Sequence, residues 1–63
     1  MKRRALLQHL TRYGCRLVRE GGSHSIWENP IADRHASIPR HREIPDFTAK
    51  RICGQLGIPT PQV

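Results

Sequence analysis

Glycine and proline divide this chain into short segments, and this division limits the possible folds more than any other feature of the sequence. The breaks fall at Gly14, at the Gly21-Gly22 pair, at Asn29-Pro30 and at Gly57. Glycine permits tight turns, and proline can neither continue a central strand nor extend a helix. The chain must therefore be assembled from several short helices and strands.

These elements have room for one small core. A domain of 63 residues hides only about 60% of the surface that its unfolded chain exposes. The apolar side chains are spread along the whole length rather than gathered in one block. We therefore expect a single domain over residues 1–63.

The first segment has the pattern of a helix over residues 2–13. Leu6, Leu10 and Tyr13 follow one another at helical spacing and form one apolar stripe. Gly14 is expected just past the helix end in a left-handed cap, with Cys15 folding back onto Leu10.

The last segment predicts a second helix that starts at Thr48 and stops at Gly57. Threonine is a good N-cap, and Phe47 before it is placed to pack onto Ile52. Ile58, beyond the glycine, is expected to pack back onto Ile52 or Cys53.

Three strands are expected between the helices, at residues 15–19, 23–28 and about 34–38. Each is rich in strand-forming residues and is bounded by turn residues. In the third strand, Ala36 and Ile38 share one face by the two-residue period. The order helix, strand, strand, strand, helix predicts an α+β fold, with two helices covering one face of the sheet.

The sequence leaves open which side chains of the second strand point to the core. Strict alternation puts His24, Ile26 and Glu28 on one face and Ser25 and Trp27 on the other. If Ile26 faces the core, so does His24. A bulge at the mouth of the hairpin, or Trp27 as the core residue instead, would free His24. We favour burial of Trp27 over a role in stacking an RNA base.

The charge balance indicates a nucleic-acid partner. Eleven Lys and Arg residues against five Asp and Glu residues give a net charge of +6, and the isoelectric point is about 10.8. A membrane is a poor alternative, because no stretch approaches the ~18 apolar residues of a span. The basic start lacks the features of an export signal, so we expect a cytoplasmic protein with two free thiols, Cys15 and Cys53.

The hairpin carries the clearest candidate for chemistry. His24 follows the turn Gly21-Gly22-Ser23, where little side-chain bulk blocks the approach of a substrate. Histidine gives and takes protons near neutral pH, and exposed glycine amides accept a phosphate. These groups suit RNA cleavage, in which a ribose 2′-hydroxyl attacks its own phosphate. From spacing alone, a histidine at a strand edge is more often solvated or structural than catalytic.

The chain also resembles a known family, the HicA toxins. The resemblance rests on Gly22-Ser23-His24, on Ile38-Pro39-Arg40-His41, on the pattern from Thr48 to Gly57 and on the opening segment from Leu6 to Gly14. Such proteins look like a double-stranded-RNA-binding domain, with a three-stranded antiparallel sheet against two helices. The resemblance implies a ribosome-independent mRNA interferase with no metal or cofactor, silenced by a HicB-type antitoxin.

Carried over by position, the resemblance makes His24 the catalytic residue. Gly22 and Ser23 match the turn before it, and His41 matches a Pro-x-His motif. Whether Ser23 or His41 assists catalysis stays open. Glu20 departs from the family, which more often has a polar or basic residue there, and an acid so close to His24 would repel RNA.

Several groups are candidates for contact with RNA phosphates. Besides the backbone at Gly22, they are the basic side chains of Lys2, Arg3, Arg4, Arg40, Arg42, Lys50 and Arg51. An alternative function is a non-catalytic RNA-binding module with the same fold. A zinc-held domain built from the histidines and cysteines fails on spacing, because there is no Cys-x-x-Cys and no close histidine pair.

Overall fold

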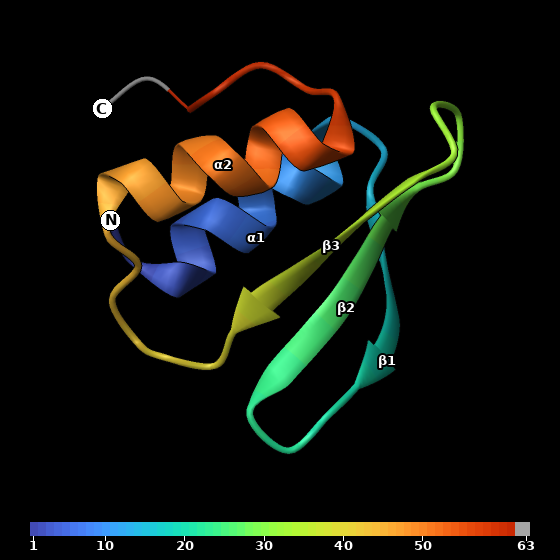
Figure 1. Cartoon of the computed structure of the whole chain (residues 1–63). Helices are drawn as coiled ribbons and strands as arrows, with labels where there is room; N and C mark the ends of the chain where they lie inside the picture. Colours follow the sequence, from blue (N-terminus) through green and yellow to red (C-terminus); the bar gives the residue numbers. More distant parts are fainter. Residues whose placement is uncertain (62–63) are drawn as a thin grey trace.

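The computed structural model describes residues 1–61 and contains two helices and three strands. The elements are α1 (Arg3–Arg12), β1 (Arg16–Glu20), β2 (His24–Asn29), β3 (Arg34–Pro39) and α2 (Asp46–Leu56). The strands form one antiparallel sheet in the order β1-β2-β3, and both helices lie on the same side of it (Figure 1). The α+β class and the predicted order are confirmed. The predicted boundaries differ by one or two residues, except at the start of α2, where the N-cap is Pro45 rather than Thr48.

The C-terminal end of α1 has the predicted left-handed cap. Gly14 has φ 86°, and the amide of Cys15 donates to the carbonyl of Leu10 at 2.9 Å. Cys15 and Leu10 both join the core. The second helix ends in the same way at Gly57, which has φ 72°.

The start of α2 differs from the prediction. The carbonyl of Pro45 accepts a hydrogen bond from the amide of Ala49 at 3.0 Å, and the helix begins before Thr48. Thr48 is therefore a buried residue of the first turn, not the N-cap. The Phe47 side chain is 70% exposed and does not pack onto Ile52, because it lies on the solvent side of the same turn.

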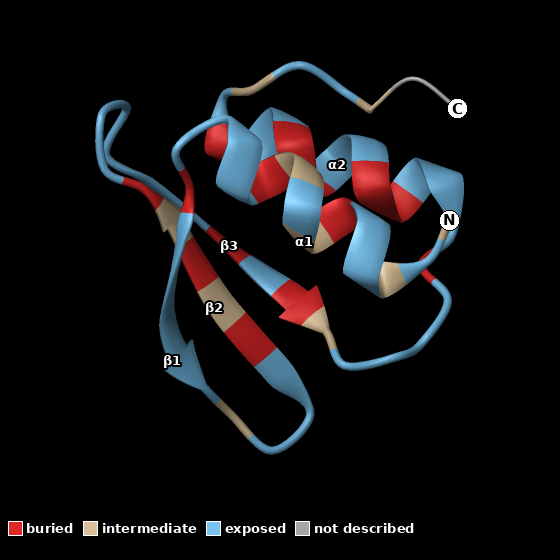
Figure 2. Ribbon diagram, turned by 180° about the vertical axis from the view of Figure 1, so that it is seen from behind, coloured by how far each residue is buried: buried red, intermediate tan, exposed pale blue. Residues whose placement is uncertain are grey.

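The strand pairing settles which face each β2 residue occupies. Ser25 and Trp27 are buried against the helices, whereas His24 is exposed and Ile26 is half-buried on the open face (Figure 2). Trp27 is thus the core residue, as favoured from the sequence, and His24 is free. The sheet does contain a bulge, but it lies in β1 between Leu17 and Arg19 rather than at the hairpin mouth.

The core lies between the sheet and the two helices. It consists of Leu6, Leu10, Cys15, Trp27, Ala36, Ile38, Ile44, Ala49, Ile52, Cys53 and Leu56. Both cysteines are free and buried, and burial raises the pKa of each thiol. Neither helix in residues 1–61 has the length and apolar character needed to cross a membrane.

Candidate functional site

His24 is the first residue of β2, and its side chain points to the open face of the sheet. Its cross-strand partner is Pro39 at the end of β3. The hydroxyl oxygen of Ser23 lies 3.0 Å from its Nδ1 atom, within hydrogen-bond distance. Because β2 alternates, the imidazole projects away from the core while its neighbour Ser25 is fully buried.

A broad hollow of about 770 Å³ begins at His24 and continues along β3 towards α2. Its walls come from three elements. The lining residues are His24 and Ile26 of β2, Arg34, His35, Ala36, Ser37 and Pro39 of β3, and Arg51 and Gln55 of α2. The candidate histidine therefore lies at one end of an open site that also contains positive charge.

The hairpin before His24 depends on Gly21. The amide of Gly21 donates to the carbonyl of His24 at 2.8 Å. A Cβ atom at position 21 would lie only 2.7 Å from that carbonyl oxygen, whereas one at Gly22 would meet nothing within 4 Å. The close approach of the two backbones thus requires glycine at position 21. Sequence reasoning singled out Gly22 and missed this contact.

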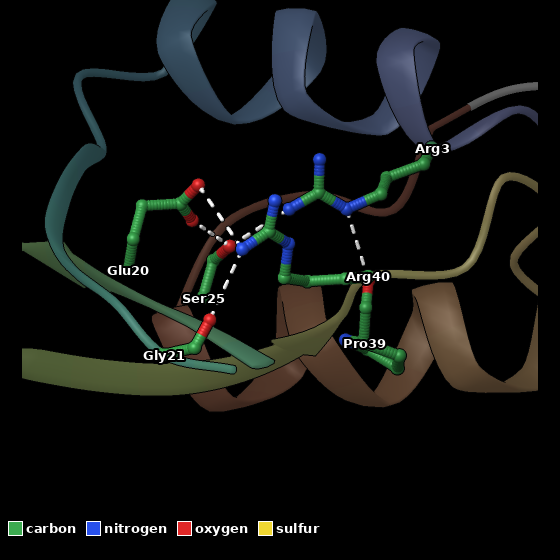
Figure 3. Close-up of polar contacts among 6 residues, drawn as sticks. All are labelled: Arg3, Glu20, Gly21, Ser25, Pro39 and Arg40. Carbon is green, nitrogen blue, oxygen red and sulfur yellow. Dashed lines mark hydrogen bonds and ion pairs between the residues drawn. The ribbon is translucent and has the colours of Figure 1, made fainter. Parts of the chain in front are cut away.

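Behind His24, on the helix side of the sheet, polar groups form a network (Figure 3). Arg3 donates from Nη2 to the hydroxyl of Ser25 at 2.8 Å and from Nε to the carbonyl of Pro39 at 2.9 Å. The hydroxyl of Ser25 in turn donates to the carboxylate of Glu20. The guanidinium of Arg3 is therefore engaged within the protein.

Arg40 completes this network from the segment after β3. Its Nη1 donates to the carbonyl of Gly21 at 3.1 Å and lies 3.7 Å from the carboxylate of Glu20. The hydrogen bond from Ser25 and the charges of Arg40 and Arg3 lower the pKa of Glu20. Glu20 pairs with Ser25 across the strands, so its charge is held on the face opposite His24.

The predicted phosphate-binding residues do not form one patch. Arg51 lines the hollow that contains His24. A separate hollow at the start of α1 is lined by Lys2, Arg3, Arg4 and Arg42, and Lys2 pairs there with Glu43 at 3.3 Å. Lys50 lies elsewhere, beside Phe47. His41 is exposed in the segment between β3 and α2 and is not among the residues that line the His24 hollow.

Sequence reasoning missed four polar residues of the hollow, namely Arg34, His35, Ser37 and Gln55. Two of them had a usable signal. The two-residue period that puts Ala36 and Ile38 on one face of the third strand leaves His35 and Ser37 on the other. The register of β2 with β3 puts that second face beside His24. Arg34 and Gln55 had no such signal, because their proximity depends on how α2 packs against β3.

The histidines and cysteines considered for a zinc site do not come together as a set of metal ligands in the part of the chain that the structure describes. Within residues 1–61, no group of three or more His, Cys, Asp or Glu side chains is close enough to hold a metal ion. On the open face, two such side chains do lie close together: Oε1 of Glu28 is 3.4 Å from Nε2 of His35. Glu28 also accepts a hydrogen bond from Arg16 at 2.6 Å.

The chain was compared with known protein families, curated proteins and solved structures. The family model described as the HicA toxin of bacterial toxin-antitoxin systems matches residues 3–58. The chain belongs to the HicA toxin family. The matched region includes all five helices and strands and every residue that lines the His24 hollow. No curated protein and no solved structure matches the chain.

HicA membership identifies the chain as the toxin of a toxin-antitoxin pair, for which a cognate antitoxin is the implied partner. The family is known for mRNA interferases. At Glu20, where the sequence led us to expect repulsion of RNA, the carboxylate accepts a hydrogen bond from Ser25 and is faced by Arg40. The repulsion of RNA expected from the sequence is therefore reduced, because the charge is paired and lies on the other face of the sheet.

Proposed function

We propose that this HicA chain is an mRNA interferase, a ribosome-independent endoribonuclease that acts in the cytoplasm with His24 as its catalytic residue. One observation carries the proposal. An exposed imidazole lies at the end of an open hollow whose walls include Arg34 and Arg51. A proton-transfer group beside positive charge is the combination needed to cleave a phosphodiester.

The proposed reaction uses the RNA's own ribose as nucleophile. His24 removes the proton from a 2′-hydroxyl, whose oxygen then forms a bond to the adjacent phosphorus. The bond from phosphorus to the 5′ oxygen breaks, and this oxygen takes a proton from water, which has free access to the open hollow. His24 then gives the proton it removed to the hydroxide that this leaves, and the imidazole is neutral again. The products are a 2′,3′-cyclic phosphate and a 5′-hydroxyl. Arg51 stabilises the negative charge that grows on the phosphate.

Ser23 has a positioning role in this scheme. Its hydroxyl lies 3.0 Å from Nδ1 of His24, so a hydrogen bond there directs the other ring nitrogen, Nε2, towards the hollow. His41 lies outside the hollow, and we assign it a contact with RNA phosphate rather than a proton transfer. Arg4 and Arg42, beside the start of α1, are assigned the same kind of contact.

The decisive experiment is a nuclease assay with purified wild type, His24→Ala and His9→Ala. His9 belongs to a different hollow and controls for the loss of an imidazole. We expect His24→Ala to lose about 10²- to 10⁴-fold in rate, to stop arresting growth and to keep its circular-dichroism spectrum, because the side chain is exposed. EDTA should leave wild-type activity intact. Full activity in His24→Ala, or a strict requirement for Mg²⁺, would contradict the proposal.

The second candidate is a non-catalytic RNA-binding module, which the basic charge and the fold also permit. The same assay separates the two, because wild type and His24→Ala would then bind RNA equally and neither would cleave it. For the antitoxin, we propose a HicB-type protein whose acidic surface covers the His24 hairpin. An inhibitor in that position excludes RNA by occupying its site.

A further inference from the structure

The hollow extends well beyond the surroundings of His24. It follows β3 from Pro39, the cross-strand partner of His24, to His35 and Arg34 at the other end of the strand. Pro39 and His35 are four steps apart along the strand, which is a distance of about 13 Å. Cleavage of one bond needs only the end at His24, so the remaining length requires another explanation.

The chemistry of the walls changes along this length. Arg51 and Arg34 contribute positive charge, while half-buried Ile26 contributes apolar surface on the sheet. Ser37 and Gln55 contribute neutral hydrogen-bonding groups. No carboxylate is among the lining residues that the structure describes.

Arg34 is held in place at its end of the hollow. Its Nη1 donates to the carbonyl of Gly54 at 3.5 Å, and its Cδ atom packs against Gly57 beyond the end of α2. These contacts place the exposed Arg34 side chain at the end of the hollow that lies beside the end of α2. Arg34 and Arg51 thus flank a surface able to contact bases.

From this arrangement we propose that the hollow along β3 is a binding track for single-stranded RNA. The nucleotides next to the cleaved bond lie between β3 and α2, with the cleaved phosphate at Arg51 and a neighbouring phosphate at Arg34. Their bases lie on the surface around Ile26, and Ser37 and Gln55 bond to base edges or 2′-hydroxyls. Unpaired RNA is recognised by this mixture of charge, flat apolar contact and hydrogen bonds. The inference rests on the proposed function and deepens it.

Gln55 provides the test, because it is exposed on α2 and its replacement does not disturb the core. Gln55→Lys and Gln55→Glu are made in the His24→Ala chain, so that the RNA stays intact during measurement. The matched controls are Gln8→Lys and Gln8→Glu, the same charge changes at an exposed residue of α1 that lines a different hollow. Binding of a short fluorescent single-stranded RNA is followed by anisotropy over a range of salt concentrations.

A charge added on the track should steepen the logarithmic salt dependence of binding by about 0.7, the value for one phosphate of a single strand. When salt is lowered from about 1 M to about 0.1 M, the affinity of Gln55→Lys for the RNA should therefore rise about fivefold more than that of the His24→Ala chain with Gln55 unchanged. Gln55→Glu should weaken binding, the Gln8 variants should have smaller effects, and a duplex of the same sequence should compete poorly.

Equal effects at Gln8 and Gln55 would overturn the track, because only net charge would then matter. Unchanged binding in both Gln55 variants would overturn it as well. Neither result would affect the catalytic role of His24, which the cleavage assay tests separately. Conversely, cleavage by His24→Ala would overturn the proposed catalytic residue and leave the binding track standing.

Discussion

At the scale of single residues, two neighbours on β2 have opposite surroundings. His24 is exposed to the hollow, while Ser25 has no exposed surface and accepts a hydrogen bond from Arg3. Alternation along the strand is the cause, since consecutive side chains point to opposite faces. The network behind the sheet can therefore fix the backbone at Ser25 while the imidazole beside it stays open to a substrate.

The close approach at the hairpin gives a prediction that distinguishes two adjacent glycines. A methyl group at position 21 would collide with the carbonyl oxygen of His24, whereas position 22 has open space. We expect Gly21→Ala to lower both the melting temperature and the cleavage rate, with a stability loss of about 1–3 kcal/mol. Gly22→Ala should change stability by less than about 1 kcal/mol. Thermal melts and a cleavage assay on both variants provide the check, and equal losses would contradict this account.

The face of the sheet to which His24 points could not be predicted from the local sequence pattern. Ile26 and Trp27 are adjacent and both apolar, so the pattern alone leaves two faces possible. What decides between them is the large Trp27 side chain, which fills the space beneath the helices with 8% of its surface exposed. That outcome depends on the volume of the core, which no local pattern describes.

At the scale of elements, the network behind His24 joins parts of the chain that are far apart in sequence. Arg3 belongs to the first turn of α1, Glu20 ends β1, and Arg40 follows β3. Hydrogen bonds and an ion pair connect all three through Ser25 and Gly21. The helix, the hairpin and the end of the third strand are thereby fixed relative to one another.

This connection predicts a dependence of stability on pH. The pKa of Glu20 lies below its ordinary value of 4.5 in the folded chain, so the ionised carboxylate stabilises the fold above that pH. The contribution is lost as the pH falls through the lowered pKa. Glu20→Gln should therefore be less stable than wild type at neutral pH, and the difference should shrink in acid.

Urea unfolding at a series of pH values measures this difference. Glu43→Gln serves as the control, because Glu43 is a surface acid that pairs only with Lys2 among the contacts described. Its removal should have a smaller effect, since exposed pairs of this kind contribute about 0–1 kcal/mol. If the free energy of unfolding of Glu20→Gln differed from that of wild type by the same amount at every pH, the carboxylate would not stabilise the fold through its charge.

The elements themselves were predictable to different degrees. Gly14 and Gly57 specify the helix ends locally, because only a residue that tolerates positive φ suits those positions. Thr48 was a misleading signal, since Pro45 already provides the first carbonyl of α2. The far end of the hollow was not predictable, because Gln55 meets β3 only through the packing of two elements.

At the scale of the whole molecule, charge distribution matters more than total charge. The net charge is +6, but the guanidinium of Arg3 faces inward and Arg40 is turned towards Gly21 and Glu20. Arg51 and Arg34 remain at the hollow. A partner with an acidic surface is thus attracted over long distances by the whole molecule. At close range it meets positive charge both at the His24 hollow and at Arg4 and Arg42 beside the start of α1.

Association with the antitoxin should therefore slow as salt rises. Added salt shortens the range of attraction to about 8–10 Å at physiological strength, which reduces the steering of the two proteins towards each other. Stopped-flow mixing of toxin and antitoxin over a range of salt concentrations gives the rate constants. The association rate should fall much more than the dissociation rate changes. An association rate independent of salt would argue against electrostatic guidance.

The two outer strands of the sheet also determine how the molecule behaves when many copies are crowded together. An open strand edge invites pairing with another chain and, in time, aggregation. The helix α2 packs against β3, while β1 is short, bulged at Val18 and carries Arg16 and Arg19 beside the exposed Leu17. Charge and irregular geometry make that edge a poor template for fibril growth. The fold thus tolerates exposed apolar surface on β1 without making that strand a good template for a neighbouring copy.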